Sequence, residues 1–292
     1  MSIGRSIKER FEQGKPLFSV EFFPPKDDAG GERMLETAAQ IQPHQPDFVS
    51  ITYGAGGGTR ATTMRYARLL KEEHGFEVMP HLTCVGHTRE ELLEILEEFS
   101  EAGFRNVMAL RGDPPKGETT FKPVPGGLSY GSDLVALIRE NFPDFGIGVG
   151  GYPEKHPEAS DFDSDLDHLK IKVDAGADFI TTQLFFDNSV YFDFVSRCRN
   201  RGIDIPVLPG LLPVLSIGQV RRFCTMCEAG LPSALEQGLE AAPEDEQPVV
   251  GADWALSQTK ALLAGGAPGY HLYALNKSDS TLRILEGLRA NG

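Results

Sequence analysis

Short apolar runs rich in β-branched and aromatic residues alternate with amphipathic helical stretches along the whole chain. Between the runs, apolar residues recur at the spacing of one helix face. The strands that this pattern predicts cover residues 18–22, 48–52, 78–82, 107–110, 147–150, 179–185, 207–210 and 270–273. The clearest helices are predicted between them, at 90–102, 133–141, 165–175 and 190–201.

Several helix ends are marked by local signals. Thr88 stands three residues before Glu91, which is the pattern of a capping box at a helix start. Gly103 and Gly176 stand where two of the helices should stop, because glycine tolerates the left-handed conformation that often follows a helix. The least regular stretch, residues 232–248, is predicted to form a helix and an acidic surface loop before the last strand and helix.

Strands that are each followed by a helix, eight times over in 292 residues, predict an α/β fold of the (β/α)8 TIM-barrel type. A doubly wound parallel sheet is the alternative. No linker or break in composition divides the chain, so we expect a single domain over residues 1–292.

The net charge of −14 argues against a general nucleic-acid binder, which would normally be basic. The chain start has no apolar signal region, and no stretch is long and apolar enough to span a membrane, so a cytoplasmic protein is expected. Cys84, Cys198, Cys224 and Cys227 lack the further ligands of a zinc site. We therefore expect buried or half-buried thiols and no metal.

Active sites of such barrels lie at the C-terminal ends of the strands. Alternation along the first strand places Val20 and Phe22 on one face and Ser19 and Glu21 on the other. Glu21 should then point into the barrel among Phe and Pro neighbours, where burial raises a carboxyl pKa and favours a general acid. The alternative is a structural ion pair with an arginine or lysine of the lumen.

Asp113 follows a strand and precedes two prolines, so its carboxylate should be held stiffly enough to anchor an amidine-like ligand edge. An Asx turn is the alternative role for this residue. Gln183 ends an apolar strand, and its amide can donate and accept, as a pterin or a carboxamide requires. A lumen glutamine satisfied by its neighbours is the alternative.

The glycine-rich segment 54–58 lacks the spacing of a dinucleotide fingerprint, because Thr59 stands where the third glycine should be. We interpret it as a flexible loop that lets a ligand approach the backbone. On this acidic chain, a diphosphate cofactor would need a local group of cationic and aromatic side chains, and residues 152–172 contain such a group. For its lysines, the alternative is an ordinary solvated helix face. These side chains are Tyr152, Lys155, His156, Lys170 and Lys172.

Taken together, these segments resemble the methylenetetrahydrofolate reductase family, in its short bacterial form. The motifs that carry the resemblance run in order over nearly the whole chain. They are FSVEFFPPK at 18–26, FVSITYGAGGGTR at 48–60, PHLTC at 80–84, ALRGDPP at 109–115, GGYPEKHPEA at 150–159, VDAGADFITTQLFFD at 173–187, PVLPGLLPV at 206–214 and LYALNKS at 272–278.

The resemblance implies a non-covalent FAD across the top of the barrel and a ping-pong cycle. NADH or NADPH reduces the flavin, and 5,10-methylenetetrahydrofolate then accepts the hydride and becomes 5-methyltetrahydrofolate, in one-carbon metabolism and methionine supply. It also implies a homo-oligomer. The short chain implies that the C-terminal regulatory domain of the longer eukaryotic members, with its adenosylmethionine feedback, is absent.

The resemblance also assigns roles to residues. Glu21 resembles the acid that protonates folate N10, and Asp113 the carboxylate that holds the pterin near the flavin. Gln183 is similar to an amide that serves pterin and nicotinamide in turn. Phe223, one helical turn after Gln219, resembles a stacking platform for both substrates. The implied FAD contacts are Thr52, Tyr53, Ala55, His81, Arg111, Gly112, Tyr130, Gly131, Tyr152, His156, Asp165 and Lys172.

Three positions depart from the family pattern. His168 and Ile171 stand where some relatives carry polar or basic FAD contacts. Lys277 stands where many relatives have arginine at the folate glutamyl end, and lysine can hold a carboxylate but not in a bidentate fork.

Two other classes of function stay open at this point. One is a barrel lyase or aldolase, although no lysine ends an apolar strand and no residues have metal-ligand spacing. The other is a non-catalytic barrel that binds folate or flavin, against which the joint presence of Glu21, Asp113 and Gln183 argues. Some relatives also work without flavin or with another electron donor.

Overall fold

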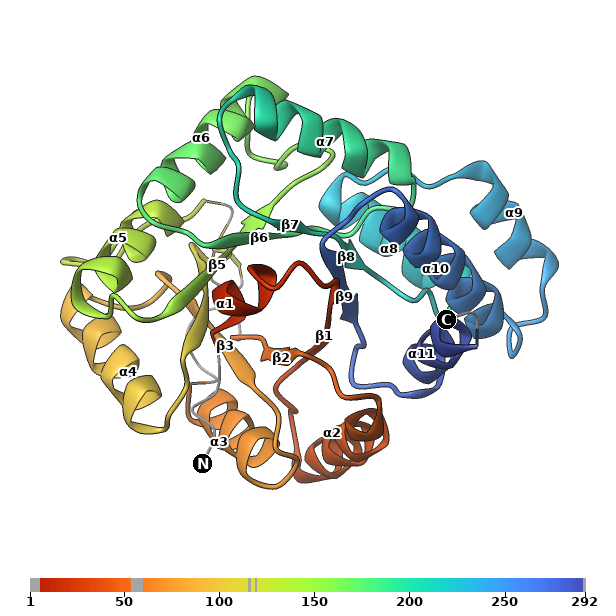
Figure 1. Ribbon diagram of the computed structural model, residues 1–292, viewed down its shortest axis with the longest axis horizontal. Helices are drawn as coiled ribbons and strands as arrows, with labels where there is room; N and C mark the ends of the chain where they lie inside the picture. Colours follow the sequence, from red (N-terminus) through yellow and green to blue (C-terminus); the bar gives the residue numbers. More distant parts are fainter. Residues whose placement is uncertain (1–5, 54–59, 115–116, 119, 291–292) are drawn as a thin grey trace.

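A ring of parallel strands surrounded by helices forms the protein in the computed structural model, which describes residues 6–53, 60–114, 117–118 and 120–290 (Figure 1). The strands are β1 Leu17–Phe22, β2 Phe48–Ile51, β3 Val78–Thr83, β4 Asn106–Leu110, β5 Gly146–Gly151, β6 Phe179–Thr182, β7 Val207–Leu208, β8 Gly210–Leu211 and β9 Gly269–Tyr273. Their order in the sheet is β7-β6-β5-β4-β3-β2-β1-β9-β8.

The helices that the structure describes lie outside the ring, apart from α1 (Figure 1). They are α1 Ile7–Phe11, α2 Asp28–Ile41, α3 Arg60–Glu72, α4 Arg89–Glu101, α5 Gly131–Asn141, α6 Phe162–Asp174, α7 Asn188–Asn200, α8 Ile217–Cys227, α9 Ser233–Ala241, α10 Gln247–Ala264 and α11 Asp279–Arg289, with a 3-10 helix at Gln42–His44. The capping box of Thr88 and Glu91 is confirmed at the start of α4. Gly103 and Gly176 adopt positive φ after α4 and α6, as predicted.

Pairing between the first strand and the last closes the ring. Ser19 of β1 lies opposite Phe48 of β2 on one side and His271 of β9 on the other, in parallel register throughout. A doubly wound sheet would leave two free edges and reverse its order at a switch point, so this alternative is excluded. The predicted (β/α)8 barrel is confirmed.

The predicted strand 207–210 is divided at Pro209 into β7 and β8. Proline has no N–H to give to a neighbouring strand, so the ladder is interrupted there. The carbonyl of Pro209 still accepts the N–H of His271 at 2.9 Å, and the Gly210 N–H is satisfied by the hydroxyl of Thr182 at 2.9 Å. Between β7 and β8 the ring is therefore continuous through the covalent chain at Pro209 and not through hydrogen bonds between these two strands.

Alternation along the strands separates an outer core from the lumen. Val20 and Phe22 are fully buried against the helices, as predicted from the sequence. The lower lumen is filled by a separate apolar cluster. Its buried members are Ile7, Leu17, Phe48, Met79, Met108, Phe179 and Leu208.

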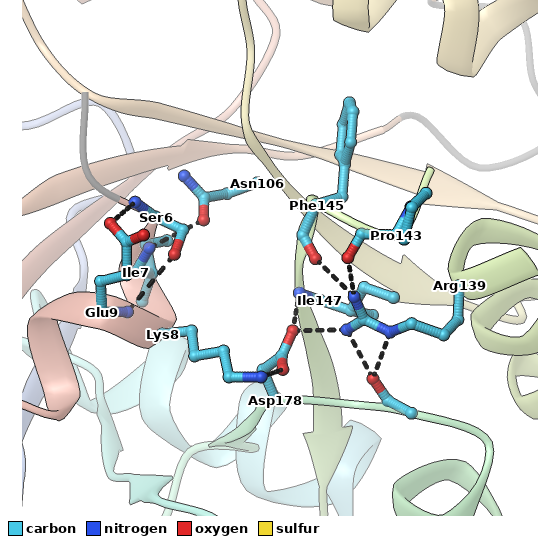
Figure 2. A network of polar contacts seen from close by, with 11 residues as sticks. Ser6, Ile7, Lys8, Glu9, Asn106, Arg139, Pro143, Phe145, Ile147 and Asp178 are labelled. Atoms are coloured by element: carbon cyan, nitrogen blue, oxygen red, sulfur yellow. Dashed lines mark hydrogen bonds and ion pairs between the residues drawn. The ribbon is translucent and has the colours of Figure 1, made fainter. Parts of the chain in front are cut away.

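Helix α1 closes the lower end of the lumen (Figure 2). Ile7 is fully buried, and its N–H donates to Asn106 Oδ1 at 2.9 Å, while the Asn106 amide donates to Glu77 at 2.8 Å. Lys8 lies 3.1 Å from the carboxylate of Asp178, which also accepts from Arg139 at 2.7 Å. Buried polar groups at this end thus have specific partners, and the helix is held in one position.

The ring carries additional helices after β8. Helices α8, α9 and α10 enclose a second apolar cluster around Val220, Leu235 and Leu239. The helix predicted within 232–248 is α9, and the acidic turn after it leads directly into α10. This second cluster places the end of α8 beside the C-terminal ends of the strands, because Leu184, Leu212 and Tyr273 belong to it as well.

Candidate active site

Glu21 lies in the upper lumen near the C-terminal end of β1, as predicted, with only 8% of its side chain exposed. Its Oε2 accepts the hydroxyl proton of Ser50 at 3.2 Å. The same oxygen lies 3.3 Å from His81 Nε2 and 3.4 Å from His271 Nε2. The alternative of an ion pair with a lumen arginine or lysine is wrong, because the partners of this carboxylate are two histidines and a serine.

The expected direction of the Glu21 pKa shift is also wrong. Burial does raise the pKa of this carboxyl, but the nearby rings of His81 and His271, together with the hydrogen bond of His271, outweigh burial and bring the pKa to about 2. The sequence argument counted the Phe and Pro neighbours along the chain and missed the histidines that other strands contribute. In the protein without ligands, Glu21 is therefore a carboxylate.

His271 connects Glu21 to a second hydroxyl. Its Nδ1 lies 2.7 Å from the Ser19 hydroxyl, and Ser19 can in turn donate to the Tyr270 carbonyl at 3.5 Å. His271 is fully buried, so both ring nitrogens have protein partners only. Ser19, His271 and Glu21 thus form a chain of hydrogen bonds along which protonation of one member changes the others.

The ends of β1 and β9 are fastened to each other at the mouth. Asn276 Oδ1 accepts the Phe23 N–H at 2.9 Å, and its amide donates to the Phe23 carbonyl at 2.8 Å. Leu275 and Asn276 both adopt positive φ, which makes the sharp turn after β9. Lys277 follows this turn and is exposed, so its ammonium is accessible to a ligand at the rim.

Asp113 is exposed at the end of the β4 loop, and its carboxylate has no hydrogen bond within the described part of the chain. Burial raises the pKa of both Tyr152 and Cys227, and the nearby Asp113 carboxylate adds to each shift. Arg111 is instead paired: its guanidinium holds Glu158 through two bonds of 2.5 and 2.8 Å, which raises its pKa. Gly112 adopts positive φ between them, and a side chain there would collide with Val85.

The loop between β5 and α6 brings several predicted cofactor contacts together. The rings of Tyr152 and His156 pack edge to face with centroids 4.4 Å apart. Asp165 accepts the His156 N–H at 3.1 Å. Lys172 points inward and donates to the Gly150 carbonyl at 2.7 Å, and burial lowers its pKa to about 8 although Asp165 opposes the shift.

The predicted contacts around β2 and α5 fall in three different environments. Thr52 is half-buried beyond β2, and Gly131 begins α5 so close to the β4 end that a Cβ added to it would lie 3.4 Å from the Arg111 backbone nitrogen. Tyr130 is 65% exposed. Tyr53 is buried in the outer core with its hydroxyl 3.0 Å from His87, so only its main chain is available to a ligand. Ala55 lies outside the described residues.

The predicted substrate residues are on two neighbouring elements. Gln183 follows β6, and its Oε1 accepts the N–H of Leu184 at 2.9 Å, which leaves its amide N–H groups to donate. Gln219 and Phe223 lie one turn apart on α8. The side-chain Oε1 of Gln219 accepts the Leu215 N–H at 2.8 Å. Phe223 is half-buried beneath the guanidinium of Arg222. His168 and Ile171 are exposed on α6.

Several polar atoms of the upper lumen are buried without a hydrogen-bond partner among the described residues. They are His81 Nε2, Thr83 Oγ1 and Thr181 Oγ1. The 3.3 Å approach of His81 to Glu21 is within ion-pair range but is not aligned as a hydrogen bond. Buried polar atoms without partners are rare in folded proteins and indicate groups that a ligand or water satisfies.

In residues 6–53, 60–114, 117–118 and 120–290 no three His, Cys, Asp or Glu side chains are grouped so that they could hold a metal ion. None of the helices described there is both long and apolar enough to cross a bilayer. The four cysteines are free thiols, buried or half-buried as expected.

A (β/α)8 barrel with a carboxylate and two imidazoles inside the lumen, below a mouth lined with loops, defines the class of this protein. The family model of methylenetetrahydrofolate reductase matches residues 6–289, and the chain belongs to that family. The 5,10-methylenetetrahydrofolate reductase of Pectobacterium carotovorum is 39% identical over 281 residues, covering 94% of this chain and 91% of that protein.

A plant relative, methylenetetrahydrofolate reductase (NADH) 1 of Arabidopsis thaliana, is 40% identical over 99% of this chain. The chain spans about half of its length, 51%. Among solved structures, a Clostridium thermocellum protein described as binding two copies of 5-methyl-5,6,7,8-tetrahydrofolic acid superposes with a TM-score of 0.68 over 98% of both chains. At 14% identity this likeness concerns the fold alone.

Proposed function

We propose that this protein reduces 5,10-methylenetetrahydrofolate to 5-methyltetrahydrofolate, with a non-covalent FAD that NADH or NADPH reduces in a ping-pong cycle. The observation that carries the proposal is the buried Glu21, in contact with His81 and His271, in a chain that the family model matches from end to end. The names of the bacterial and plant relatives support the substrate and the reaction type.

The residues of the upper lumen fit a flavin. Gly150 of β5 has no side chain, and the nearest described atom to a Cβ built there is Leu110 Cδ2, at 3.7 Å, which leaves room for a flat ring at this strand end. Thr83, Thr181 and His81 offer polar atoms without partners to the edge of such a ring. Lys172 is a half-buried cation on a chain of charge −14, and this is the group that a diphosphate needs.

FAD, when bound, supplies hydride transfer from the nicotinamide to the folate. The predicted cofactor residues that would hold it are those of the β2, β3, β4 and β5 loops and of α6. Among them Lys172 and Arg111 would meet the diphosphate, and Tyr152 with His156 would cover the ring system. Because Arg111 already pairs with Glu158, its guanidinium is held in one orientation.

Glu21 would deliver a proton to folate N10, which opens the five-membered ring to an iminium that can accept hydride. Since its own pKa is about 2, Glu21 would first have to take up a proton and would then pass it to N10; the rings of His81 and His271, 3.3 and 3.4 Å away, are the groups placed to relay that proton. The Ser19 hydroxyl, 2.7 Å from His271, stabilises the ring that gives up the proton. The buried site excludes water from this transfer.

The carboxylate of Asp113, exposed at the mouth, would accept hydrogen bonds from the pterin and stabilise the cationic iminium. Gln183 would donate its amide protons to the pterin or to the nicotinamide carboxamide. Phe223 and Gln219 on α8 would provide the stacking face, and the exposed ammonium of Lys277 would meet the glutamyl carboxylate.

An absorption spectrum tests the proposal most directly. The purified protein, incubated with FAD if necessary, should show a flavin spectrum. Anaerobic addition of NADH or NADPH should bleach it, and 5,10-methylenetetrahydrofolate should restore it with formation of 5-methyltetrahydrofolate. A protein that takes up no flavin from excess FAD contradicts the cofactor. A reduced flavin that the folate cannot reoxidise favours the alternative of a barrel that binds without turnover.

A further inference from the structure

Two loops at the mouth, far apart in the sequence, are tied to each other. Glu154 in the β5–α6 loop accepts the N–H of Gly230, which follows α8, at 2.8 Å. Beside this bond, Lys155 Nζ lies 3.8 Å from the carboxylate of Glu228. One loop carries the predicted cofactor residues Tyr152 and His156, and the other ends the helix that carries Gln219 and Phe223.

The backbone on both sides of this tie is held in an unfavourable conformation. Lys155 has φ +79° and Glu228 has φ +51°, and residues with a side chain rarely adopt such left-handed φ values because their Cβ approaches the backbone too closely. Lys155 is fixed by its own ammonium, which donates to the carbonyls of His156 at 2.9 Å and Ala159 at 3.0 Å. Both loops are therefore set in the geometry that joins them.

Glu154 itself is placed where a carboxylate is costly. Its Oε2 is buried without a hydrogen-bond partner in the described chain. Burial raises the pKa of Glu154, the Gly230 hydrogen bond opposes the shift, and Asp187 adds to it. Helix α8 does not need this residue for its own end, because the Glu228 N–H already bonds to the Cys224 carbonyl. Local stability alone therefore does not account for Glu154.

The tie fixes one face of α8 opposite the cofactor loop. Gln219, Phe223 and Cys227 recur every four residues and share that face. Phe223, Cys227 and Tyr273 pack in the same apolar cluster, which places the face over the end of β9. Arg221 joins α8 to Glu236 and Glu240 of α9, but these ion pairs do not reach the cofactor loop. The Glu154 hydrogen bond joins the chain just after α8 to that loop, so removal of Glu154 would let the end of the helix move relative to Tyr152.

We propose that Glu154 is a positioning residue of the substrate site: its hydrogen bond to Gly230 holds the Gln219–Phe223 face of α8 at the distance from Tyr152 that substrate stacking requires. This inference rests on the proposed function for the identity of the substrates. The tie itself is a property of the chain without ligands.

The test compares Glu154→Ala with Glu154→Gln, which keeps an oxygen acceptor for the Gly230 N–H. Glu154→Ala should raise the half-saturation concentrations of folate and nicotinamide about 3- to 10-fold, the usual effect of one lost hydrogen bond. Limiting rates of both half-reactions, FAD affinity and the melting temperature should stay within twofold or a few degrees of wild type. Glu154→Gln should restore most of the loss. Glu244→Ala, an equal charge change on an exposed turn, is the matched control.

Amide hydrogen exchange of the peptide 217–231 provides a readout that does not depend on activity. Glu154→Ala should accelerate exchange at the end of α8, whereas Glu154→Gln and Glu244→Ala should not. The inference is overturned if Glu154→Ala changes neither the exchange of this peptide nor the half-saturation concentrations. It is also overturned if Glu154→Ala and Glu154→Gln lose FAD, rate and stability to the same extent. If the wild type lacks flavin and reductase activity but exchange still responds to Glu154→Ala, the proposed function fails while the tie stands.

Discussion

The two ends of the lumen differ in the side chains that fill them: the lower end is apolar and the upper end is polar. At the lower end the layer around Phe48 and Phe179 is apolar, and the Ile7 N–H and the Asn106 amide that approach it are both satisfied. At the upper end the same strands, continued by a few residues, present Glu21 and two imidazoles, together with hydroxyls that lack partners. The change takes place within two residues of β1, between Leu17 and Ser19.

The difference shows which requirement each end meets. Apolar packing and paired polar groups lower the free energy of the folded state, as the closed end does. Buried polar atoms without partners raise it, so their presence at the open end indicates that this end is built to bind a ligand. Substitutions at the two ends should therefore separate activity from stability.

The largest effect is expected at the open end, from Glu21→Gln. Glutamine keeps the shape and can still accept from Ser50, but it cannot relay a proton between an imidazole and N10. Reoxidation of reduced flavin by the folate should fall on the order of 100- to 10,000-fold, the usual contribution of general acid catalysis. Reduction of the flavin by the nicotinamide needs no such proton and should continue with FAD bound.

Stopped-flow traces of each half-reaction distinguish this role from a packing role. Near-normal reoxidation by the folate would remove Glu21 as the proton donor. Loss of FAD with both half-reactions slowed together would show that the Glu21–His81–His271 contacts mainly hold the lumen together. The melting temperature of the variant should change little, because the cost of a buried carboxylate is removed with its ion pairs.

The second effect belongs to the closed end and should leave activity intact. Ile7→Ala removes a fully buried side chain from the apolar layer and should lower the free energy of unfolding by about 2–4 kcal/mol. Thermal unfolding followed by circular dichroism measures the loss, and the exposed Lys15→Ala serves as control with a change within about 0.5 kcal/mol. Half-reaction rates of the folded holoenzyme that fall along with stability would show that the ends are coupled.

The third effect is a pH dependence at the open end. Burial lowers the pKa of Lys172 from 10.5 to about 8, so this side chain is charged below pH 8 and loses its charge above it. A diphosphate favours the charged form, and FAD affinity should be constant below pH 8 and weaken above it by up to about tenfold per pH unit. Fluorescence titrations between pH 6.5 and 9.5 measure this, with Lys172→Met as the control that cannot titrate.

The lowered pKa of Lys172 has the opposite effect on the stability of the folded protein without cofactor, which increases with pH. Between pH 8 and 10.5 the unfolded chain keeps the Lys172 proton that the folded chain has lost, so this lysine contributes stability as pH rises through that window. A FAD affinity that falls with pH while this contribution to stability rises indicates that both effects come from Lys172. A FAD affinity in Lys172→Met that shows the same pH profile as wild type would exclude Lys172 from the diphosphate site.

Features that depend on neighbours in the sequence could be predicted. The strands, the Thr88 cap and the orientation of Glu21 follow from periodicity and alternation, which are local properties. The position of Asp113 at a strand end follows from the fold. Motif order over nearly the whole chain was enough to suggest the family, which the family model confirms.

The features that sequence reasoning missed come from distant segments. His271 reaches Glu21 across 250 residues of sequence, and no local pattern in Tyr270–Leu272 indicates that it does. The pairing of Arg111 with Glu158 and the clamp of Asn276 on Phe23 are equally non-local. The available signals were alternation along β9, which places His271 on the lumen face, and the ring closure that makes β9 a neighbour of β1.

Closure of the ring between β1 and β9 also has a consequence for the order in which the protein can become competent. Synthesis produces Glu21 and, 250 residues later, His271, and their contact needs β9 in place beside β1. A nascent chain that has not yet reached β9 can bring His81 to the carboxylate but not His271 with its Ser19 contact. The complete set of contacts around Glu21 therefore forms only after the ring of strands has closed.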